Sequence, residues 1–248
     1  MSEKIAVEFR QVNKAFGQRK VLDNVSFQVE EGQALCVLGR SGTGKSVTLK
    51  LMIGLLKPDS GKVCIDDEDI SHFEAEDLSR VRRNIGFLFQ SAALFDSFTL
   101  ADNLAMPLRR LDKSKTEPEI KEAVDCALKM VGLEKDKKKM PAELSGGMRK
   151  RAGLARALVL NPRLLLVDEP SSGLDRITAA EIDNLLIRVK EENQATLVIV
   201  THDVRGARRV GDKIAVLDQG RLAGWGQADE LEQSENEIVR NLVSESCK

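Results

Sequence analysis

Histidine, tryptophan and tyrosine are scarce in this sequence, and its cysteines are scattered along it. It contains two histidines, His72 and His202, one tryptophan and no tyrosine. Its four cysteines lie far apart and form no Cys-x-x-Cys motif. Zinc sites are usually built from clustered cysteines and histidines, so a site of that kind is not expected. Scattered thiols also favour a reducing compartment over a secreted, disulfide-bonded protein.

Long hydrophobic runs and an excess of positive charge are also missing. No segment approaches the roughly 18 apolar residues that a membrane-spanning helix needs. The N-terminal stretch "MSEKIAVEFR" lacks the apolar core of a signal peptide. The net charge of -1 gives no basic excess of the kind that nucleic-acid binding usually requires. We therefore expect a cytoplasmic protein without a nucleic-acid partner, which would serve a membrane only through another protein.

The sequence does contain a regular alternation of short apolar runs and helical patterns. Continuous apolar runs of strand length begin near Ala34, Ile85, Leu164 and Ala195. Such runs are typical of strands that are buried on both faces of a parallel sheet. Because helical patterns separate the runs, the sequence predicts an α/β fold with helices on both faces of the sheet.

Two regions depart from this alternation. In the N-terminal part, "IAVEFRQV" and "NVSFQVEEG" alternate apolar and polar residues, which predicts half-buried antiparallel strands. Residues from about 92 to 160 contain only helical patterns and predict an inserted α-helical sub-domain. The length is that of one large domain, so we expect a single domain over residues 1–248 that carries this insertion.

Gly39–Ser46, "GRSGTGKS", matches the phosphate-loop pattern G-x-x-x-x-G-K-S/T between a predicted strand and a predicted helix. Gly42 and Gly44 allow the backbone to wrap closely, so that successive N–H groups point at phosphate oxygens. Lys45 is expected to reach the β- and γ-phosphates of a nucleoside triphosphate. The Ser46 hydroxyl is expected to bind Mg²⁺.

Two acidic residues end the apolar run that begins at Leu164. Asp168 is expected at the carboxyl edge of the sheet, where α/β proteins bind ligands, and would hold Mg²⁺ there. Glu169 would point elsewhere because side chains alternate along a strand, and it is a candidate to orient and deprotonate an attacking water. Taken alone, the pair could equally be residues that keep a strand end soluble.

Gln90 and His202 follow two other apolar runs and are expected at the same edge of the sheet. Gln90 could contact both Mg²⁺ and the attacking water, or it could only cap the local backbone. His202 could hydrogen-bond the γ-phosphate, although a single histidine in such a place is more often structural.

A second glycine-led helix start lies in "LSGGMRKRAGLARALVL", residues 144–160. The Ser145 hydroxyl and the N–H groups of Gly146 and Gly147 form a potential second anion cradle. Each chain holds only one phosphate loop, so this cradle has no evident ligand within one chain. A head-to-tail dimer would supply one, because each cradle would cap the γ-phosphate held by the other chain.

Three cations occupy the first turn of this helix: Arg149, Lys150 and Arg151. Positive charge is normally disfavoured at a helix N-terminus, and a bound anion would offset that effect. The three side chains spread over about 200° of the helix, so at most two can face a nucleotide. The others are expected in solvent or near acidic residues of the helical sub-domain.

These motifs, in this order, resemble the nucleotide-binding subunit of ATP-binding cassette transporters over nearly the whole chain. Gly39–Ser46 is similar to the Walker A loop, and Leu164–Glu169 is similar to Walker B with its catalytic glutamate. Leu144–Met148 is similar to the LSGGQ signature. The remaining similarities are Gln90 to the Q-loop glutamine, Ser172–Asp175 to the D-loop and His202 to the switch histidine.

The resemblance implies a RecA-like P-loop NTPase core with an N-terminal antiparallel β sub-domain and an inserted α-helical sub-domain. It implies ATP and Mg²⁺ as ligands and a homodimer of ATPase subunits. Catalytic roles fall to Glu169, His202 and Gln90, and metal contacts to Ser46, Gln90 and Asp168. The implied nucleotide-binding residues are Phe16, which would stack on adenine, Gly39, Arg40, Ser41, Gly42, Thr43, Gly44, Lys45, Ser46, Val47, Ser145, Gly146, Gly147 and Asp175.

Three residues, Met148, Leu174 and Arg176, differ from those frequent in the family, and none of them carries a group assigned to the chemistry. The C-terminal segment leaves one question open. Its apolar residues Ile238, Leu242 and Val243 could pack against this chain or against a neighbouring one.

The stretch Phe89–Arg110, together with the signature, resembles the ATPases of Mla/Mce-type phospholipid transport systems. This implies an integral membrane permease, an MCE-type lipid-binding protein and a place on the cytoplasmic face of the inner membrane. The segments Ala92–Phe95 and Ala105–Leu108 could receive a short permease helix or belong to the helical core.

Two alternatives remain at this level. One is a cassette ATPase for another transport task, such as lipoprotein release or import of a small polar solute. The other is a soluble cassette protein of DNA repair, chromosome organisation or translation. Proteins of the latter kind typically need a long coiled coil or two cassettes in one chain, and this sequence has one motif set.

Overall fold

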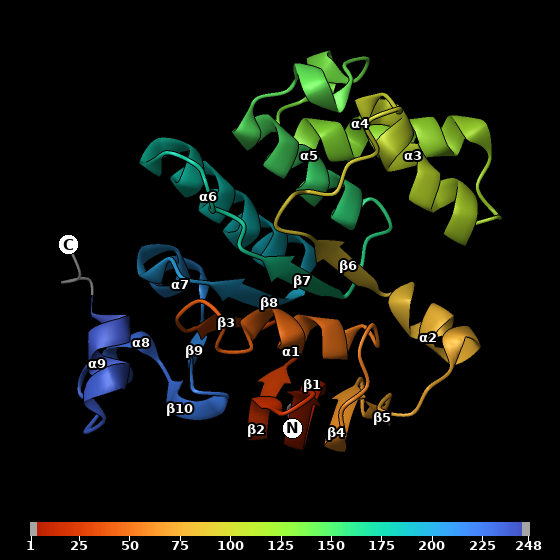
Figure 1. Cartoon of the computed structure of the whole chain (residues 1–248). Helices are drawn as coiled ribbons and strands as arrows, with labels where there is room; N and C mark the ends of the chain where they lie inside the picture. Colours follow the sequence, from red (N-terminus) through yellow and green to blue (C-terminus); the bar gives the residue numbers. More distant parts are fainter. Residues whose placement is uncertain (1–3, 245–248) are drawn as a thin grey trace.

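The computed structural model describes residues 4–244, which form a large sheet, a small sheet and helices around both (Figure 1). The large sheet has the strand order β10-β9-β3-β8-β7-β6. All neighbouring strands in it are parallel except β10, which runs antiparallel to β9. Its strands are β3 (Ala34–Leu38), β6 (Ile85–Leu88), β7 (Leu164–Asp168), β8 (Thr196–Thr201), β9 (Lys213–Asp218) and β10 (Arg221–Gly226).

The four apolar runs of the sequence are β3, β6, β7 and β8, so the predicted parallel sheet is confirmed. Side chains of β3 alternate between two cores, as a strand covered on both faces requires. Leu35 and Val37 belong to one core, whereas Cys36 and Leu38 belong to the other.

The small sheet is antiparallel, with the order β2-β1-β4-β5, which confirms the predicted N-terminal β region. Its strands are β1 (Ile5–Phe16), β2 (Arg19–Glu30), β4 (Ser60–Ile65) and β5 (Glu68–Asp69). Helix α1 (Lys45–Met52) lies between the two sheets and contacts β4, β7 and β8. Leu49 and Met52 of this helix are fully buried in the core that the two sheets share.

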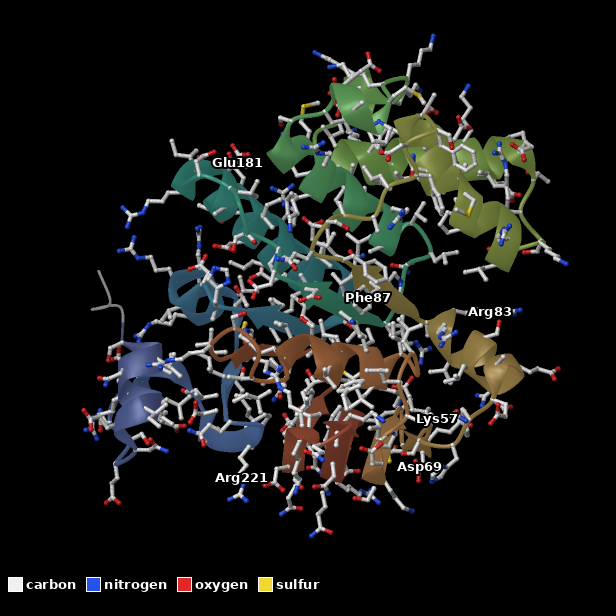
Figure 2. The ribbon with its side chains drawn as sticks, in the orientation of Figure 1. Lys57, Asp69, Arg83, Phe87, Glu181 and Arg221 are labelled. Carbon is white, nitrogen blue, oxygen red and sulfur yellow. The ribbon has the colours of Figure 1, made fainter. Side chains whose placement is uncertain are left out.

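The opposite face of the large sheet is covered by α6 (Arg176–Asn193) and α7 (Val204–Val210). Helix α2 (Ala75–Arg82) packs near β6, and α8 (Ala228–Glu232) and α9 (Glu237–Val243) pack near β10. The charged side chain of Glu181 lies on the outer side of α6, whereas Arg221 of β10 binds Asp23 of the small sheet (Figure 2). Within residues 4–244, no helix combines the length and apolar character needed to span a membrane.

Between β6 and β7 the chain forms helices only. They are α3 (Leu100–Leu111), α4 (Glu117–Met130), α5 (Gly146–Leu158) and two short 3₁₀ turns, η1 (Glu134–Asp136) and η2 (Pro141–Glu143). They gather on one side of the large sheet, away from the small sheet (Figure 1). We propose that residues 92–160 form a helical sub-domain within a single domain over residues 1–248.

The C-terminal helix α9 packs on its own chain. Val243 is fully buried and Leu242 is partly buried against the same core, whereas Ile238 is exposed. Of the three apolar residues in question, Ile238, at 43% exposed, is therefore the one most available to a neighbour. Residues 245–248 of this segment lie outside the described part of the chain.

Candidate functional site

The predicted phosphate loop runs from the end of β3 into the first turn of α1, as the strand–loop–helix pattern requires. Gly42 and Gly44 have φ values of 82° and 104°, which glycine adopts without strain. Gly44 is also packed tightly, because a Cβ atom there would lie 2.8 Å from the Val21 carbonyl oxygen and 2.8 Å from Leu22 Cδ2. Strand β2 thus fixes the place where the loop turns into the helix.

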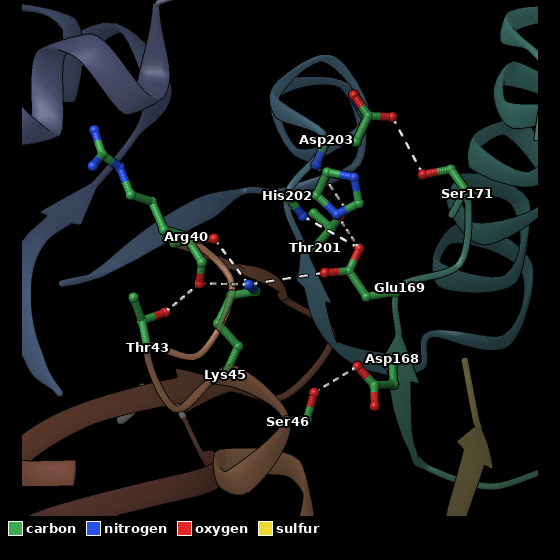
Figure 3. Close-up of polar contacts among 12 residues, drawn as sticks. Arg40, Thr43, Lys45, Ser46, Asp168, Glu169, Ser171, Thr201, His202 and Asp203 are labelled. Atoms are coloured by element: carbon green, nitrogen blue, oxygen red, sulfur yellow. Dashed lines mark hydrogen bonds and ion pairs between the residues drawn. The ribbon is translucent and has the colours of Figure 1, made fainter. Parts of the chain in front are cut away.

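Lys45 is buried and points back into this loop (Figure 3). Its Nζ donates hydrogen bonds to the carbonyl oxygens of Gly39, at 2.8 Å, and Arg40, at 3.2 Å. It also lies 3.9 Å from Oε1 of Glu169. Burial lowers the pKa of Lys45, and the carboxylates of Glu169 and Asp168 act in the opposite direction. The charge on the phosphate-loop lysine therefore interacts directly with the carboxylates at the end of β7.

Asp168 is the last residue of β7, and the Ser46 Oγ donates a hydrogen bond of 3.0 Å to its Oδ1. Burial raises the pKa of Asp168, while the Ser46 hydrogen bond opposes that change. Two oxygen ligands suited to Mg²⁺ thus lie side by side. The sequence-based pairing of Ser46 with Asp168 corresponds to a direct contact.

Glu169 and His202 lie next to each other, beside Lys45 (Figure 3). His202 Nδ1 lies 2.7 Å from Oε2 of Glu169, and the histidine side chain is 66% exposed. Glu169 itself is buried and has a left-handed backbone with φ of 48°. Its carboxylate is therefore held between a buried ammonium group and an exposed imidazole.

Ser46, Glu169 and His202 line one cavity of about 630 Å³ at the carboxyl edge of the large sheet. Gln90 lies two residues beyond β6, and it lines this cavity together with Lys45, Glu169 and His202. The complete lining is Arg19, Val21, Ser41, Gly42, Gly44, Lys45, Ser46, Val47, Gln90, Glu169 and His202. Motifs that are distant in sequence therefore form a single site.

A family model described as ABC transporter matches residues 22–172, which is more than half of the chain. The chain belongs to the ABC transporter family. Similar proteins include the probable ribonucleotide transport ATP-binding protein mkl of Mycobacterium leprae, with 44% identity over 240 residues, 97% of this chain and 69% of that protein. Methionine import ATP-binding protein MetN 2 of Pseudomonas entomophila is 39% identical over 229 residues, 91% of this chain and 68% of that protein.

Solved cassettes share the fold. A dimeric structure of the ATP-binding cassette MJ0796, in a post-hydrolysis state bound to ADP and Pi, gives a TM-score of 0.83 at 34% identity, covering 89% of this chain and 98% of that one. CbiO1 of Clostridium perfringens, part of the transporter complex cbiONQ, gives 0.83 at 27% identity, covering 97% and 99%. The chain is an ATPase and binds ATP with Mg²⁺, as ABC ATPases do.

Several residues that the resemblance assigns to nucleotide binding lie outside this cavity. Phe16, at the end of β1, is 49% exposed and does not line it. Arg40 and Thr43 contribute to the loop itself, because the Thr43 Oγ1 donates a hydrogen bond of 2.9 Å to the Arg40 carbonyl oxygen. Asp175 caps α6, accepting hydrogen bonds from the N–H groups of Ile177 and Thr178.

The signature residues begin α5 in the helical part of the cassette. Ser145 is its N-cap, and the Ser145 Oγ accepts a hydrogen bond of 3.2 Å from the Met148 N–H. Ser145 and Gly146 are exposed and Gly147 is buried, and none of the three lines the cavity of its own chain. The cradle is therefore formed locally but is not part of the cavity at the phosphate loop of the same molecule.

Arg149 and Lys150, two of the three cations of this helix, differ in burial. Arg149 is exposed, as expected for a solvated residue. Lys150, by contrast, is 6% exposed and donates a hydrogen bond of 2.7 Å to the Glu169 carbonyl oxygen. Lys150 therefore faces the strand end of its own chain, rather than solvent or an acidic residue of the helical sub-domain.

Two further contributors to the site were missed from the sequence. Arg19 and Val21, both on β2, line the cavity, and the Arg19 Nη2 donates a hydrogen bond of 3.2 Å to the Gly42 carbonyl oxygen. The basic residues of "GQRKVL" gave a possible signal. Only the pairing of β2 beneath the loop brings them into contact with it.

Proposed function

We propose that Glu169 activates the water that attacks ATP and that the chain powers a membrane transporter. The observation that carries the first part is the position of the Glu169 carboxylate, 3.9 Å from the phosphate-loop lysine and 2.7 Å from His202. A general base must lie within hydrogen-bond reach of the proton that it removes. A carboxylate beside the phosphate-loop ammonium group meets that requirement for a water next to the γ-phosphate.

In this proposal the backbone of Gly39–Val47 cradles the phosphates, and Lys45 exchanges its two carbonyl contacts for phosphate oxygens. Ser46, Asp168 and Gln90 would hold Mg²⁺, for which their oxygen atoms are suitable ligands. A bound ion would neutralise negative charge on the phosphates. His202 is exposed enough to reach the γ-phosphate while its Nδ1 stays with Glu169.

The site is proposed to be completed by a second copy of the chain. The Ser145–Gly147 cradle does not line its own cavity, and a head-to-tail pair would bring it to the partner's γ-phosphate. The similarity to the dimeric MJ0796 cassette supports this arrangement. Asp175, the N-cap residue of α6, would lie close to the same interface in such a pair.

For the membrane partner, we propose a permease that contacts the segment following Gln90. Phe95 and Phe98 are exposed, and their ring centroids are 5.6 Å apart. The other expected segment, Ala105–Leu108, is an unsuitable contact surface, because Ala105 and Leu108 are buried in the core of the helical part. The first segment alone therefore offers an apolar surface.

The transported molecule is proposed to be a phospholipid, with an MCE-type lipid-binding protein as a further partner and the cassette on the cytoplasmic face of the inner membrane. This rests on the similarity of residues 89–110 and the signature to Mla/Mce-type ATPases. The relatives named for ribonucleotide transport and methionine import favour a second candidate, import of a small polar solute.

The catalytic role is tested with Glu169→Gln. This change removes the base but keeps the shape of the side chain, so turnover should fall about 10²- to 10⁴-fold while ATP affinity stays within a few-fold. Single-turnover hydrolysis and equilibrium titration with ATP measure the two effects. A variant that hydrolyses ATP at the wild-type rate would remove Glu169 from this role.

The shared site is tested by mixing two inactive chains, one with Ser145→Arg and the other with Lys45→Ala. In a head-to-tail pair, one of the two composite sites then carries neither change, so mixing should restore measurable ATPase activity. Each variant alone serves as the control. If the mixture is no more active than its components, each site is formed within one chain.

The transported molecule is tested on the complete transporter purified from detergent extract. Lipid analysis of the co-purifying material should find bound phospholipid, and phospholipid should stimulate ATP hydrolysis in the reconstituted complex. Methionine and a ribonucleotide, the competing candidates for the transported molecule, are tested in the same ATPase assay. Stimulation by either of them, without stimulation by lipid, would replace the lipid proposal with solute import.

A further inference from the structure

Lys150 is a buried cation that none of the roles above uses. It lies in the first turns of α5 and is 6% exposed, and its Nζ donates a 2.7 Å hydrogen bond to the Glu169 carbonyl oxygen. Burial lowers the pKa of Lys150, and the charges of Glu169 and Asp168 act in the opposite direction. A buried ammonium group is costly unless it is paired, so this contact defines where the side chain must lie.

The residue that Lys150 holds has an unfavourable backbone. Glu169 has φ of 48°, a left-handed conformation that is disfavoured for a residue with a side chain. It also precedes Pro170, and a residue before proline is driven towards extended conformations. Such a conformation persists only where surrounding contacts impose it.

Backbone contacts from separate elements hold Glu169 in this conformation. Its N–H donates to the Val200 carbonyl oxygen on β8 at 2.8 Å. Its carbonyl oxygen accepts one hydrogen bond from Ser172 N–H, at 3.3 Å, and the shorter one from Lys150. The lysine contact is the only one of these that involves a side chain and a full charge, and charge-assisted hydrogen bonds are the stronger kind.

We infer that Lys150 is a positioning residue for catalysis, which fixes the left-handed turn at Glu169 and thereby aims its carboxylate. The direction of the Cα–Cβ bond follows from the backbone conformation, so a relaxed turn would move the carboxylate away from Lys45 and His202. A misplacement of about 1 Å can cost about 100-fold in rate. Lys150 also connects Glu169 to the helix that begins with the signature serine.

This inference rests on the proposed role of Glu169, and the experiment separates the two. In Lys150→Met the stem is retained and the ammonium group is lost, so kcat should fall at least about tenfold with ATP affinity unchanged within about twofold. Lys150→Arg keeps a charged donor and should recover part of the lost kcat. Lys190→Met is the matched control, because Lys190 is a partly buried lysine that binds Asp212 away from the cavity.

The same substitution is then combined with Glu169→Gln. If Lys150 acts through the carboxylate, the double variant should hydrolyse ATP no more than about twofold more slowly than Glu169→Gln alone, since residues that act as a unit are non-additive. A further tenfold loss in the double variant, or a Lys150→Met variant with wild-type kcat, would overturn the inference. Wild-type turnover in Glu169→Gln alone would instead refute the proposed role of Glu169 as the general base.

Discussion

The carboxylate of Asp183 on α6 should make the stability of the molecule depend on pH. Asp183 is 7% exposed and lies beside Asp203. A Cβ atom on Gly206 would lie 3.1 Å from an oxygen of each of these two carboxylates. Burial, reinforced by the negative charge of Asp203 and opposed by Arg209, raises the pKa of Asp183 from 3.8 to about 6.

The direction of the effect follows from proton binding. Between 3.8 and about 6 the folded molecule holds the Asp183 proton more tightly than the unfolded chain does. Stability therefore falls as the pH rises through this window, and above it the charged carboxylate destabilises the fold. At 1.36 kcal/mol per pKa unit, the full penalty is on the order of 3 kcal/mol.

Asp183→Asn removes this titration and keeps the shape of the side chain. The free energy of unfolding of the variant, relative to that of wild type, should increase by about 2 kcal/mol between about pH 4.5 and about pH 8, so the variant gains stability over wild type. Taking the difference between two pH values cancels any pH-independent effect of the amide. Urea denaturation of the nucleotide-free protein at four or five pH values gives the required curve.

Asp96→Asn provides the control, because Asp96 is exposed in the segment before α3. Its effect on the free energy of unfolding should change little over the same range. A difference between Asp183→Asn and wild type that stays constant with pH would refute the reasoning. It would mean that Asp183 is charged in the folded molecule without a penalty, through solvent or a cation that reaches it.

Two further predictions concern the backbone around the nucleotide site. Gly44→Ala introduces a Cβ atom at a φ of 104° and 2.8 Å from the Val21 carbonyl oxygen, so it should destabilise the fold by about 1–3 kcal/mol or more and abolish ATP binding. Urea denaturation measures the loss of stability, and titration with ATP measures the loss of binding. An unchanged affinity for ATP would contradict the tight fit at Gly44. Arg156→Met removes hydrogen bonds of 2.6 and 3.1 Å to the carbonyl oxygens of Ala93 and Ala92, which both have positive φ, and should cost about 1–3 kcal/mol. Hydrogen exchange after Gln90 should then become faster, and protection equal to wild type would show that Arg156 does not hold this segment.

The nucleotide site could be predicted from the sequence to the extent that strand order brings motifs together. Ser46 and Asp168 end up 3.0 Å apart because a helix after β3 and the end of β7 meet at one edge of a parallel sheet. The same rule applies to Gln90 and His202. It specifies the edge but not the individual contacts, so the bond between His202 and Glu169 could not be foreseen.

Contacts made across the two sheets were harder to predict. The N-terminal strands were recognised from their alternating pattern, but that pattern does not say which loop they support. Arg19 reaches Gly42 only because β2 lies beneath the phosphate loop, where Val21 and Leu22 also touch Gly44. The adenine contact of Phe16 stays a prediction from the resemblance, since Phe16 is 49% exposed at the end of β1 and does not line the cavity.

The burial of Lys150 follows from small residues rather than from charge. Gly147, Lys150 and Gly153 share one face of α5, because residues three apart on a helix are neighbours. A Cβ atom on Gly147 would lie 2.4 Å from Thr178 Cγ2, and one on Gly153 would lie 2.8 Å from Leu88 Cδ1.

This face is therefore packed against α6 and the end of β6, and the lysine between the two glycines must be buried with it. Charge alone made the three cations of the helix look equivalent. The spacing of the glycines distinguishes one of them, and burial of an ammonium group then requires an acceptor. The Glu169 carbonyl oxygen supplies that acceptor, which connects the packing of the signature helix to the conformation of the proposed base.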